Sequence, residues 1–166
     1  MNHNINDFTQ KEKKTDIYID DVLKKCVNES NNDYMVYEAK KNNIVLNQKL
    51  GEDDPLKIWI HKNIKLQDYI EKINKYLHWM SGECKNELIK CFNDDNENYK
   101  DDYGLSEESG DEEWYEGVSV FSAEIIITKE GKLLALITGT DDFTAQDEPL
   151  IIVMEEYKVI SAGFVF

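Results

Sequence analysis

Four apolar runs separated by turns near the end of the sequence constrain the fold more than any other feature. The turns KEGK and EEYK have the length of hairpin connections, and strands joined by such turns pair antiparallel. One longer loop, TGTDDFTAQDEP, separates the second run from the third. We therefore predict a four-stranded antiparallel meander with one face covered by helices. Its strands are residues 118–128, 133–138, 150–154 and 159–166.

The first of these runs also predicts which side chains face the helices. One alternating set is wholly apolar, whereas the other contains Ser122 and Glu124. Because alternate residues of a strand point to opposite faces, we expect Ile126 to lie on the outer face together with Glu124. The side chains predicted to face the helices are Phe121, Ala123, Ile125 and Ile127.

Helical periodicity appears in three segments. Apolar residues recur at helical spacing from about Asp16 to Val27, and again over residues 66–77. WMSGE interrupts the second pattern, and Ser81 can cap a third helix that follows it. The apolar stripe of that third helix consists of Cys84, Leu88, Cys91 and Phe92.

Short strands are predicted between the first two helices, at residues 34–38, 43–49 and 56–61. In the last of them apolar residues alternate with Lys57, Trp59 and His61, a pattern typical of a half-buried strand, so His61 is expected on the surface.

A single α+β domain accommodates all these elements. The 166 residues are enough to bury one core and few for two, so we predict one domain over residues 1–166. Residues 1–15 are polar and aperiodic, and we expect them to be disordered.

Charge is concentrated in one connection, residues 94–116. The chain has 34 acidic residues against 19 lysines and no arginine, for a net charge of −15. Residues 94–116 contain 11 acids and one lysine, which gives a local net charge of −10. Because nucleic-acid binding depends on neutralising phosphates, this composition disfavours direct nucleic-acid binding and favours a basic protein partner.

The acidic connection contains SEESGDEEWYEG, residues 106–117, in which aromatic side chains lie among six acids. An EF-hand starting at Asp94 is excluded, because Tyr99 replaces the required glycine and Leu105 replaces the bidentate glutamate. A solvated loop and a weak cation site remain alternatives to a recognition surface. The residues predicted to bind a partner are Tyr103, Glu107, Glu108, Asp111, Glu112, Glu113, Trp114, Tyr115 and Glu116.

The aromatic residues of this segment have two possible roles. Large aromatic side chains often carry the affinity of interfaces, and we assign that role to Tyr103 and Tyr115. Trp114 precedes the next strand directly, so we expect it chiefly to anchor that strand in the core.

Metal and catalytic motifs are missing from the sequence. The spacing of His78, Cys84 and Cys91 matches no usual zinc pattern, and we predict two core thiols, no structural metal and no cofactor. No nucleophile motif and no glycine-rich phosphate loop occurs, which favours a binding protein over an enzyme. The residues left as possible acid–base groups are His61, Asp141, Asp142 and Asp147.

The cellular location is inferred from what the sequence lacks. The first residues contain no apolar leader, and no run of 18 apolar residues occurs, so no membrane association is expected. Three cysteines, an odd number, do not suggest a disulfide framework. We expect a cytoplasmic protein.

The segment ECKNELIKCFND, the acidic connection and the ending GTDDFTAQDEPLIIVMEEYKVISAGF together resemble small acidic bacterial immunity proteins of polymorphic toxin systems. The resemblance covers the C-terminal half and is one of pattern. It implies a protein without catalytic residues that neutralises a basic toxin by binding it. A DNA mimic of the anti-restriction kind, an enzyme that uses loop carboxylates, and a structural or regulatory domain remain alternatives.

Overall fold

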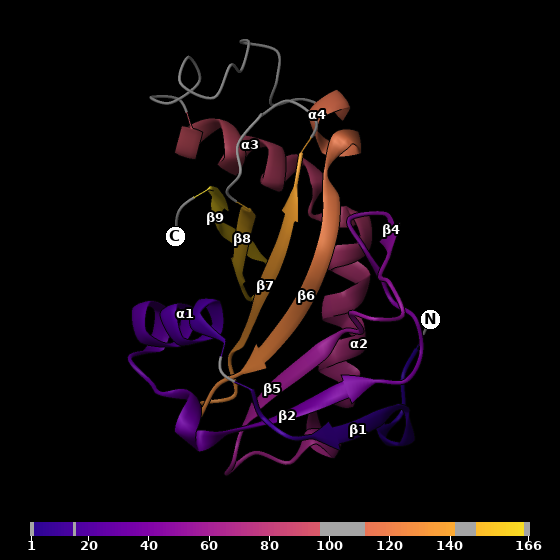
Figure 1. Ribbon diagram of the computed structural model, residues 1–166, viewed down its shortest axis with the longest axis vertical. Coiled ribbons are helices and arrows are strands. Elements are labelled where there is room, and N and C mark those ends of the chain that lie inside the picture. The colour runs from indigo at the N-terminus through magenta and orange to yellow at the C-terminus, as the bar shows by residue number, and fades with distance from the viewer. Residues whose placement is uncertain (1, 15, 97–111, 142–148, 165–166) are drawn as a thin grey trace.

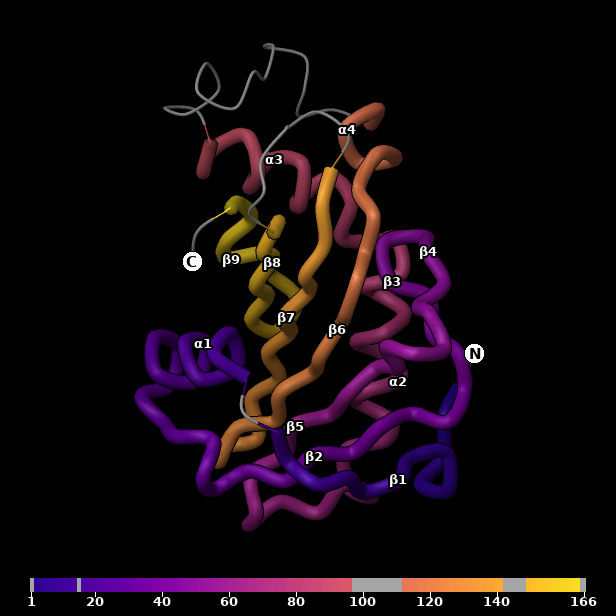
Figure 2. Tube along the Cα trace, viewed as in Figure 1, coloured from indigo at the N-terminus to yellow at the C-terminus, as the bar shows by residue number. Residues whose placement is uncertain are grey.

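A seven-stranded mixed sheet forms the centre of the molecule (Figure 1). The computed structural model describes residues 2–14, 16–96, 112–141 and 149–164. The strand order is β1-β2-β5-β6-β7-β8-β9, and Figure 2 shows β1 and β9 at opposite edges. The strands are β1 (Phe8–Lys11), β2 (Tyr34–Ala39), β5 (Lys57–His61), β6 (Ser119–Ile127), β7 (Leu133–Thr140), β8 (Leu150–Glu155) and β9 (Lys158–Gly163).

The predicted meander is part of this larger sheet. Strands β6, β7, β8 and β9 pair antiparallel in chain order. The sheet does not end at β6, because β5 pairs with it in parallel and places Ile58 opposite Ile125. Strands β2 and β1 extend the sheet further by antiparallel pairing. The prediction of a four-stranded sheet was therefore too small, since a parallel pair between distant segments leaves no turn in the sequence to reveal it.

Helices cover both faces of the sheet, whereas we expected one covered face. Helix α1 (Ile17–Val27) buries Ile19, Val22 and Leu23 against one face. Helices α2 (Ile70–His78) and α3 (Lys85–Asn96) cover the other face, which lies behind the sheet in Figure 1. Because α1 covers a face that we expected to meet solvent, two sequence predictions about side-chain exposure fail.

The first failure concerns β6. Ala123, Ile125 and Ile127 face α2 and α3 as predicted, but Phe121 is 53% exposed. Ile126, expected on an outer face, is buried beneath α1. Glu124 points to the same side as Ile126 and is buried as well. From Ala123 to Ile127 both faces of the strand are thus buried between two helical layers, whereas the register shifts between Val120 and Ser122, beside the exposed Phe121.

The second failure concerns β5. Trp59 and His61 belong to the set expected to face solvent, yet both are buried. Trp59 packs in the cluster beneath α1, and the His61 ring meets Tyr34 edge to face at 5.4 Å. The prediction of a surface histidine was wrong, because the sequence pattern shows alternation but not the layer that covers the polar side.

The N-terminal segment is ordered where the structure describes it, although we expected disorder over residues 1–15. A short 3-10 helix η1 (Ile5–Asp7) is closed by a capping box between Asn4 and Asp7. The Lys40 backbone N–H donates to the Asp7 carbonyl at 2.7 Å. Phe8 then starts β1 and is buried. Hydrogen bonds and the buried Phe8 therefore hold an edge strand whose sequence contains too few apolar residues to predict it.

The segment WMSGE does not interrupt the helical path between α2 and α3. A short 3-10 helix η3 (Leu66–Tyr69) leads into α2, and a π-helical turn η4 (Trp79–Glu83) continues from it to α3. We had expected Ser81 to cap α3. Its hydroxyl instead donates to the His78 carbonyl at 2.7 Å. Another 3-10 helix, η2 (Asn31–Asp33), precedes β2.

A separate hairpin stabilises this π-helical turn. The predicted strand at residues 43–49 is a pair, β3 (Ile44–Val45) and β4 (Gln48–Lys49). At its tip the Leu46 N–H donates to the Met80 carbonyl at 2.9 Å, and the Asn47 N–H donates to the Ser81 carbonyl at 2.8 Å. Leu46 and Asn47 have φ of 51° and 62°, and burial of Leu46 in the core offsets its unfavourable backbone conformation.

None of the helices in the described part of the chain combines the length and the apolar character that crossing a bilayer requires.

Candidate functional site: the acidic end of the molecule

Helix α4 (Glu112–Gly117) contains the described part of the predicted binding segment. Its acidic side chains Glu112, Glu113 and Glu116 are exposed. The predicted residues Tyr103, Glu107, Glu108 and Asp111 lie outside the described residues, as does the rest of residues 97–111.

Trp114 lies in the core, as we expected, but it belongs to helix α4 and not to the start of the next strand, and its burial removes it from the predicted partner-binding residues. The residue is fully buried, and its ring stacks on Phe92 of α3 with centroids 4.0 Å apart. The Trp114 Nε1–H donates to Asp141 Oδ2 at 2.8 Å. Stacking and a buried hydrogen bond therefore fix α4 on both α3 and the end of β7.

Tyr115 lies in the core and not on the surface. Only 3% of the residue is exposed, and burial raises the pKa of its hydroxyl to about 12. Lys85 Nζ lies 5.9 Å from the Tyr115 ring and 2.8 Å from Glu112 Oε1. The ring that we assigned to a partner interface thus packs inside the protein, and the affinity of any complex must come from other side chains.

The other described flank of the acidic connection is the end of α3. Asp94 and Asp95 are exposed, and Asp95 Oδ2 accepts the Ala162 N–H at 2.8 Å. Asn96 is buried and donates to the Ala162 carbonyl at 3.0 Å. These bonds fasten the end of α3 to β9.

Both flanks lie at the same end of the molecule, drawn at the top of Figure 1. Helix α3 contacts α4, so acids from the two ends of the acidic connection are brought to this end. We call this set the acidic end surface; it consists of Asp94, Glu112, Glu113 and Glu116.

The cysteines and His78 do not form a metal site. Cys84 is buried, burial raises the pKa of its thiol to about 12, and its Sγ donates to the Met80 carbonyl. Burial and Asp95 likewise raise the pKa of Cys91 to about 12. His78 is exposed and pairs with Glu83 at 3.1 Å. Across residues 2–14, 16–96, 112–141 and 149–164, no three potential ligands among His, Cys, Asp and Glu are arranged to hold a metal ion.

Of the possible acid–base residues, the two that the structure describes, His61 and Asp141, do not come together in a pocket. Asp142 and Asp147 lie outside the described residues. Asp141 is buried against Trp114, and buried His61 accepts the Asn63 N–H on Nδ1 at 3.2 Å. Each therefore has a structural role, and neither lines the pockets described below.

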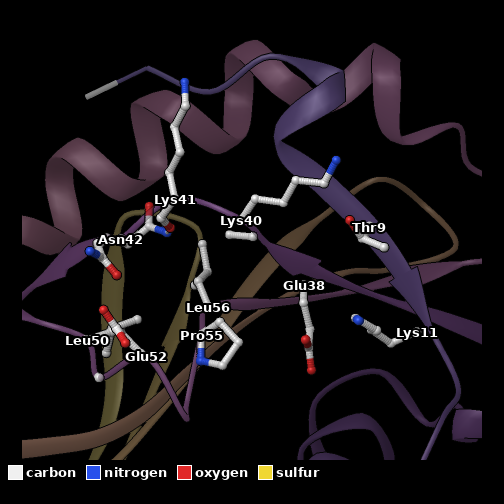
Figure 3. A pocket seen from close by; sticks show the side chains of 13 residues that line it. Thr9, Lys11, Glu38, Lys40, Lys41, Asn42, Leu50, Glu52, Pro55 and Leu56 are labelled. Atoms are coloured by element: carbon white, nitrogen blue, oxygen red, sulfur yellow. The ribbon is translucent and has the colours of Figure 1, made fainter.

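A pocket of about 450 Å³ lies beside the edge strand β1 (Figure 3). Figure 3 shows Lys40 and Lys41 directing their ammonium groups away from Glu38 and Glu52. Lys41 pairs instead with Asp7 at 3.2 Å. Since the charged groups diverge, this pocket does not direct several polar groups at one ligand.

Glu124 is the residue with an unusual environment that sequence reasoning missed. It is 5% exposed, and the Trp59 Nε1–H donates to its carboxyl group. Burial, with a further contribution from the Asp16 carboxylate, raises the pKa of Glu124 to about 7. Asp16 and Trp59 also line a neighbouring pocket of about 430 Å³. The available signal was one acid inside the apolar run of β6, which we interpreted as an outward-facing residue.

No protein-family model, curated protein or solved structure matches this chain.

Proposed function

We propose that the chain is a non-catalytic protein that binds a basic protein partner through the acidic end surface. The observation that carries this proposal is the concentration of charge. Residues 94–116 hold −10 of the net charge of −15, and the acids of the acidic end surface, which belong to this segment, are exposed at one end of the molecule. Within the described residues, Lys85 alone pairs with an acid of this surface.

The way in which buried residues fix helix α4 to the core supports this role. Trp114 and Tyr115 hold the helix in the core, so its three glutamates are presented from a fixed element. A fixed surface loses less conformational freedom on binding than a loop that must first be ordered. Concentrated charge also attracts an oppositely charged partner over about 8 Å at physiological salt, and this chiefly accelerates encounter.

We further propose that the partner is a toxin and that the chain acts as its stoichiometric inhibitor in the bacterial cytoplasm. The resemblance to immunity proteins and the lack of a catalytic motif in the sequence support this identification. A DNA mimic would carry acids spaced over much of its surface, whereas two-thirds of the excess charge here belongs to one segment.

Glu124 is the one observation that favours an enzyme instead. A carboxyl group with a pKa of about 7 near a second carboxylate has the properties of a general acid or base. Glu124 is nevertheless buried between α1 and the sheet, and it does not itself line the neighbouring pocket. A structural carboxyl group explains this geometry with fewer assumptions.

The test is inhibition of the protein encoded by the neighbouring gene. We expect that protein to be a basic toxin that binds the chain in a one-to-one complex and is inactivated by it. Neutralising α4 with E112Q/E113Q/E116Q should weaken binding by about tenfold or more at low salt. The control E52Q/D53N/D54N makes the same charge change in an exposed loop and should leave affinity unchanged.

Three results would contradict the proposal. If the α4 variant and the control lose equal affinity, only net charge matters. If neither variant loses affinity, the partner uses another surface. A partner that is a DNA-binding enzyme, released from the chain by duplex DNA, would establish the DNA mimic. A thermal melt of each variant checks that it remains folded.

A further inference from the structure

A second candidate binding site lies on α2 and η4, far along the chain from α4. It is a pocket of about 500 Å³ between the end of α2, the turn η4 and the β8–β9 turn. We call it the aromatic pocket, and it shares no residue with the acidic end surface. The lining residues used below are Glu71, Lys75, His78, Trp79, Glu83 and Tyr157.

Aromatic rings form one wall of this pocket. The Trp79 ring lies parallel to that of Tyr76, with an interplanar angle of 4° and centroids 5.8 Å apart. The Tyr157 ring stands perpendicular to both, at 5.6 Å from each. Tyr76 is buried, so the rings of Trp79 and Tyr157 are held against the core.

Tyr157 is exposed to a degree that its position does not require. It occupies the turn between β8 and β9, where polar residues and glycine are common, and 48% of the residue is exposed. An exposed aromatic ring that lines a pocket beside a second aromatic residue is a typical feature of a recognition site.

Carboxylates form the rim of the same pocket. Glu71 pairs with Lys75 at 3.5 Å, and Glu83 pairs with His78 at 3.1 Å. All four side chains are largely exposed, and contacts of this kind contribute little stability, so a ligand can replace the internal partner. With histidine counted as neutral, the rim holds two negative charges and one positive charge.

We propose that the aromatic pocket binds an arginine side chain of a partner protein. A guanidinium group stacks on aromatic rings and donates paired N–H groups to a carboxylate, which matches a wall of aromatic rings and a rim of carboxylates. The chain itself contains no arginine, so the occupant must come from another molecule. The net charge of −15 adds a general attraction for a basic partner.

The test is a titration of the ¹⁵N-labelled full chain with the peptide acetyl-Gly-Arg-Gly-amide, followed by NMR. Trp59 and Trp114 are buried and already donate their indole N–H groups to Glu124 and Asp141. The indole signal of Trp79, assigned with Trp79→Phe, therefore reports on the pocket. We expect it to shift saturably with the arginine peptide and not with the same peptide containing neutral citrulline.

Variants separate the contributions of the rings and the carboxylates. Tyr157→Ala should weaken peptide binding by about two- to fivefold, the range for an exposed cation–π contact, whereas Tyr157→Phe keeps a ring and should retain binding. E71Q/E83Q should weaken binding more than the control E52Q/D53N, which removes the same charge from an exposed loop that does not line the pocket.

Two outcomes would overturn the proposal. An equal response to the arginine and citrulline peptides would show that the charge is not recognised. Equal losses for E71Q/E83Q and its control would show that only general attraction acts. Because the probe is a peptide, neither outcome depends on whether the acidic end surface binds a toxin.

Discussion

Glu124 is the single residue whose environment departs most from what its side chain prefers. A buried carboxyl group is favoured in its neutral form, and the nearby Asp16 carboxylate adds to this preference. Asp16 itself caps α1 by accepting the N–H groups of Tyr18 and Ile19. The ionisation of Glu124 therefore affects the contact between α1 and the sheet.

This environment predicts how stability depends on pH. The pKa of Glu124 is about 7 in the folded protein against 4.5 for the unperturbed group. Folding thus favours the protonated form, and its stabilising effect is complete below pH 4.5 and is lost as the pH rises to about 7. Glu124→Gln keeps a neutral acceptor for the Trp59 indole N–H. Its free energy of unfolding should therefore rise relative to that of the wild type as the pH increases across this range, by on the order of 3 kcal/mol at pH 8.

Urea unfolding of both proteins at several pH values checks this prediction. Glu113→Gln removes an exposed carboxyl group on α4 and serves as the control for a change in net charge. A constant difference in unfolding free energy between Glu124→Gln and the wild type from pH 5 to pH 8 would contradict a raised pKa at Glu124.

The turns between the strands provide the next prediction. Gly131, in the β6–β7 turn, has a φ of 82°, and a Cβ there would collide with the Tyr69 hydroxyl. Gly131→Ala should therefore destabilise the protein by about 1–3 kcal/mol. The control is Gly51→Ala, because a Cβ at Gly51 meets no atom within 4 Å. Thermal melts give the melting temperatures of the two variants. Equal melting temperatures would show that the turn tolerates a side chain.

The strands themselves were largely predictable, and their surroundings were not. Hairpin turns and apolar runs located β6 to β9 and most of β2 and β5, because these signals are local. The burial of Trp59 and Ile126 depends on α1, which comes from a distant part of the chain. Periodicity shows that a strand has two unlike faces, but it does not show what covers each one.

Considered as a whole, the molecule unites its two halves in one sheet through the parallel pair β5–β6. The candidate site could be predicted in part, because charge is counted directly from the sequence. The positions of the aromatic residues could not, since an acidic segment with Trp114 and Tyr115 has the same sequence whether those rings face solvent or the core. The aromatic pocket was missed because Trp79 and Tyr157 meet only in the folded chain.

The burial of Tyr115 changes what the account expects of the complex. If the Tyr115 ring contacted the partner, its replacement would chiefly speed dissociation. Since its ring packs in the core, Tyr115→Ala would chiefly loosen α4 and cannot test the interface. The exposed glutamates of α4 are the side chains with which to test it.

The most direct test of the central claim is the rate of association with the product of the neighbouring gene, which we propose to be a basic toxin, measured at several salt concentrations. We predict that E112Q/E113Q/E116Q slows association and flattens its salt dependence, whereas E52Q/D53N/D54N changes neither. If the α4 variant associates at the wild-type rate with the same salt dependence, the acidic end surface does not bind the partner.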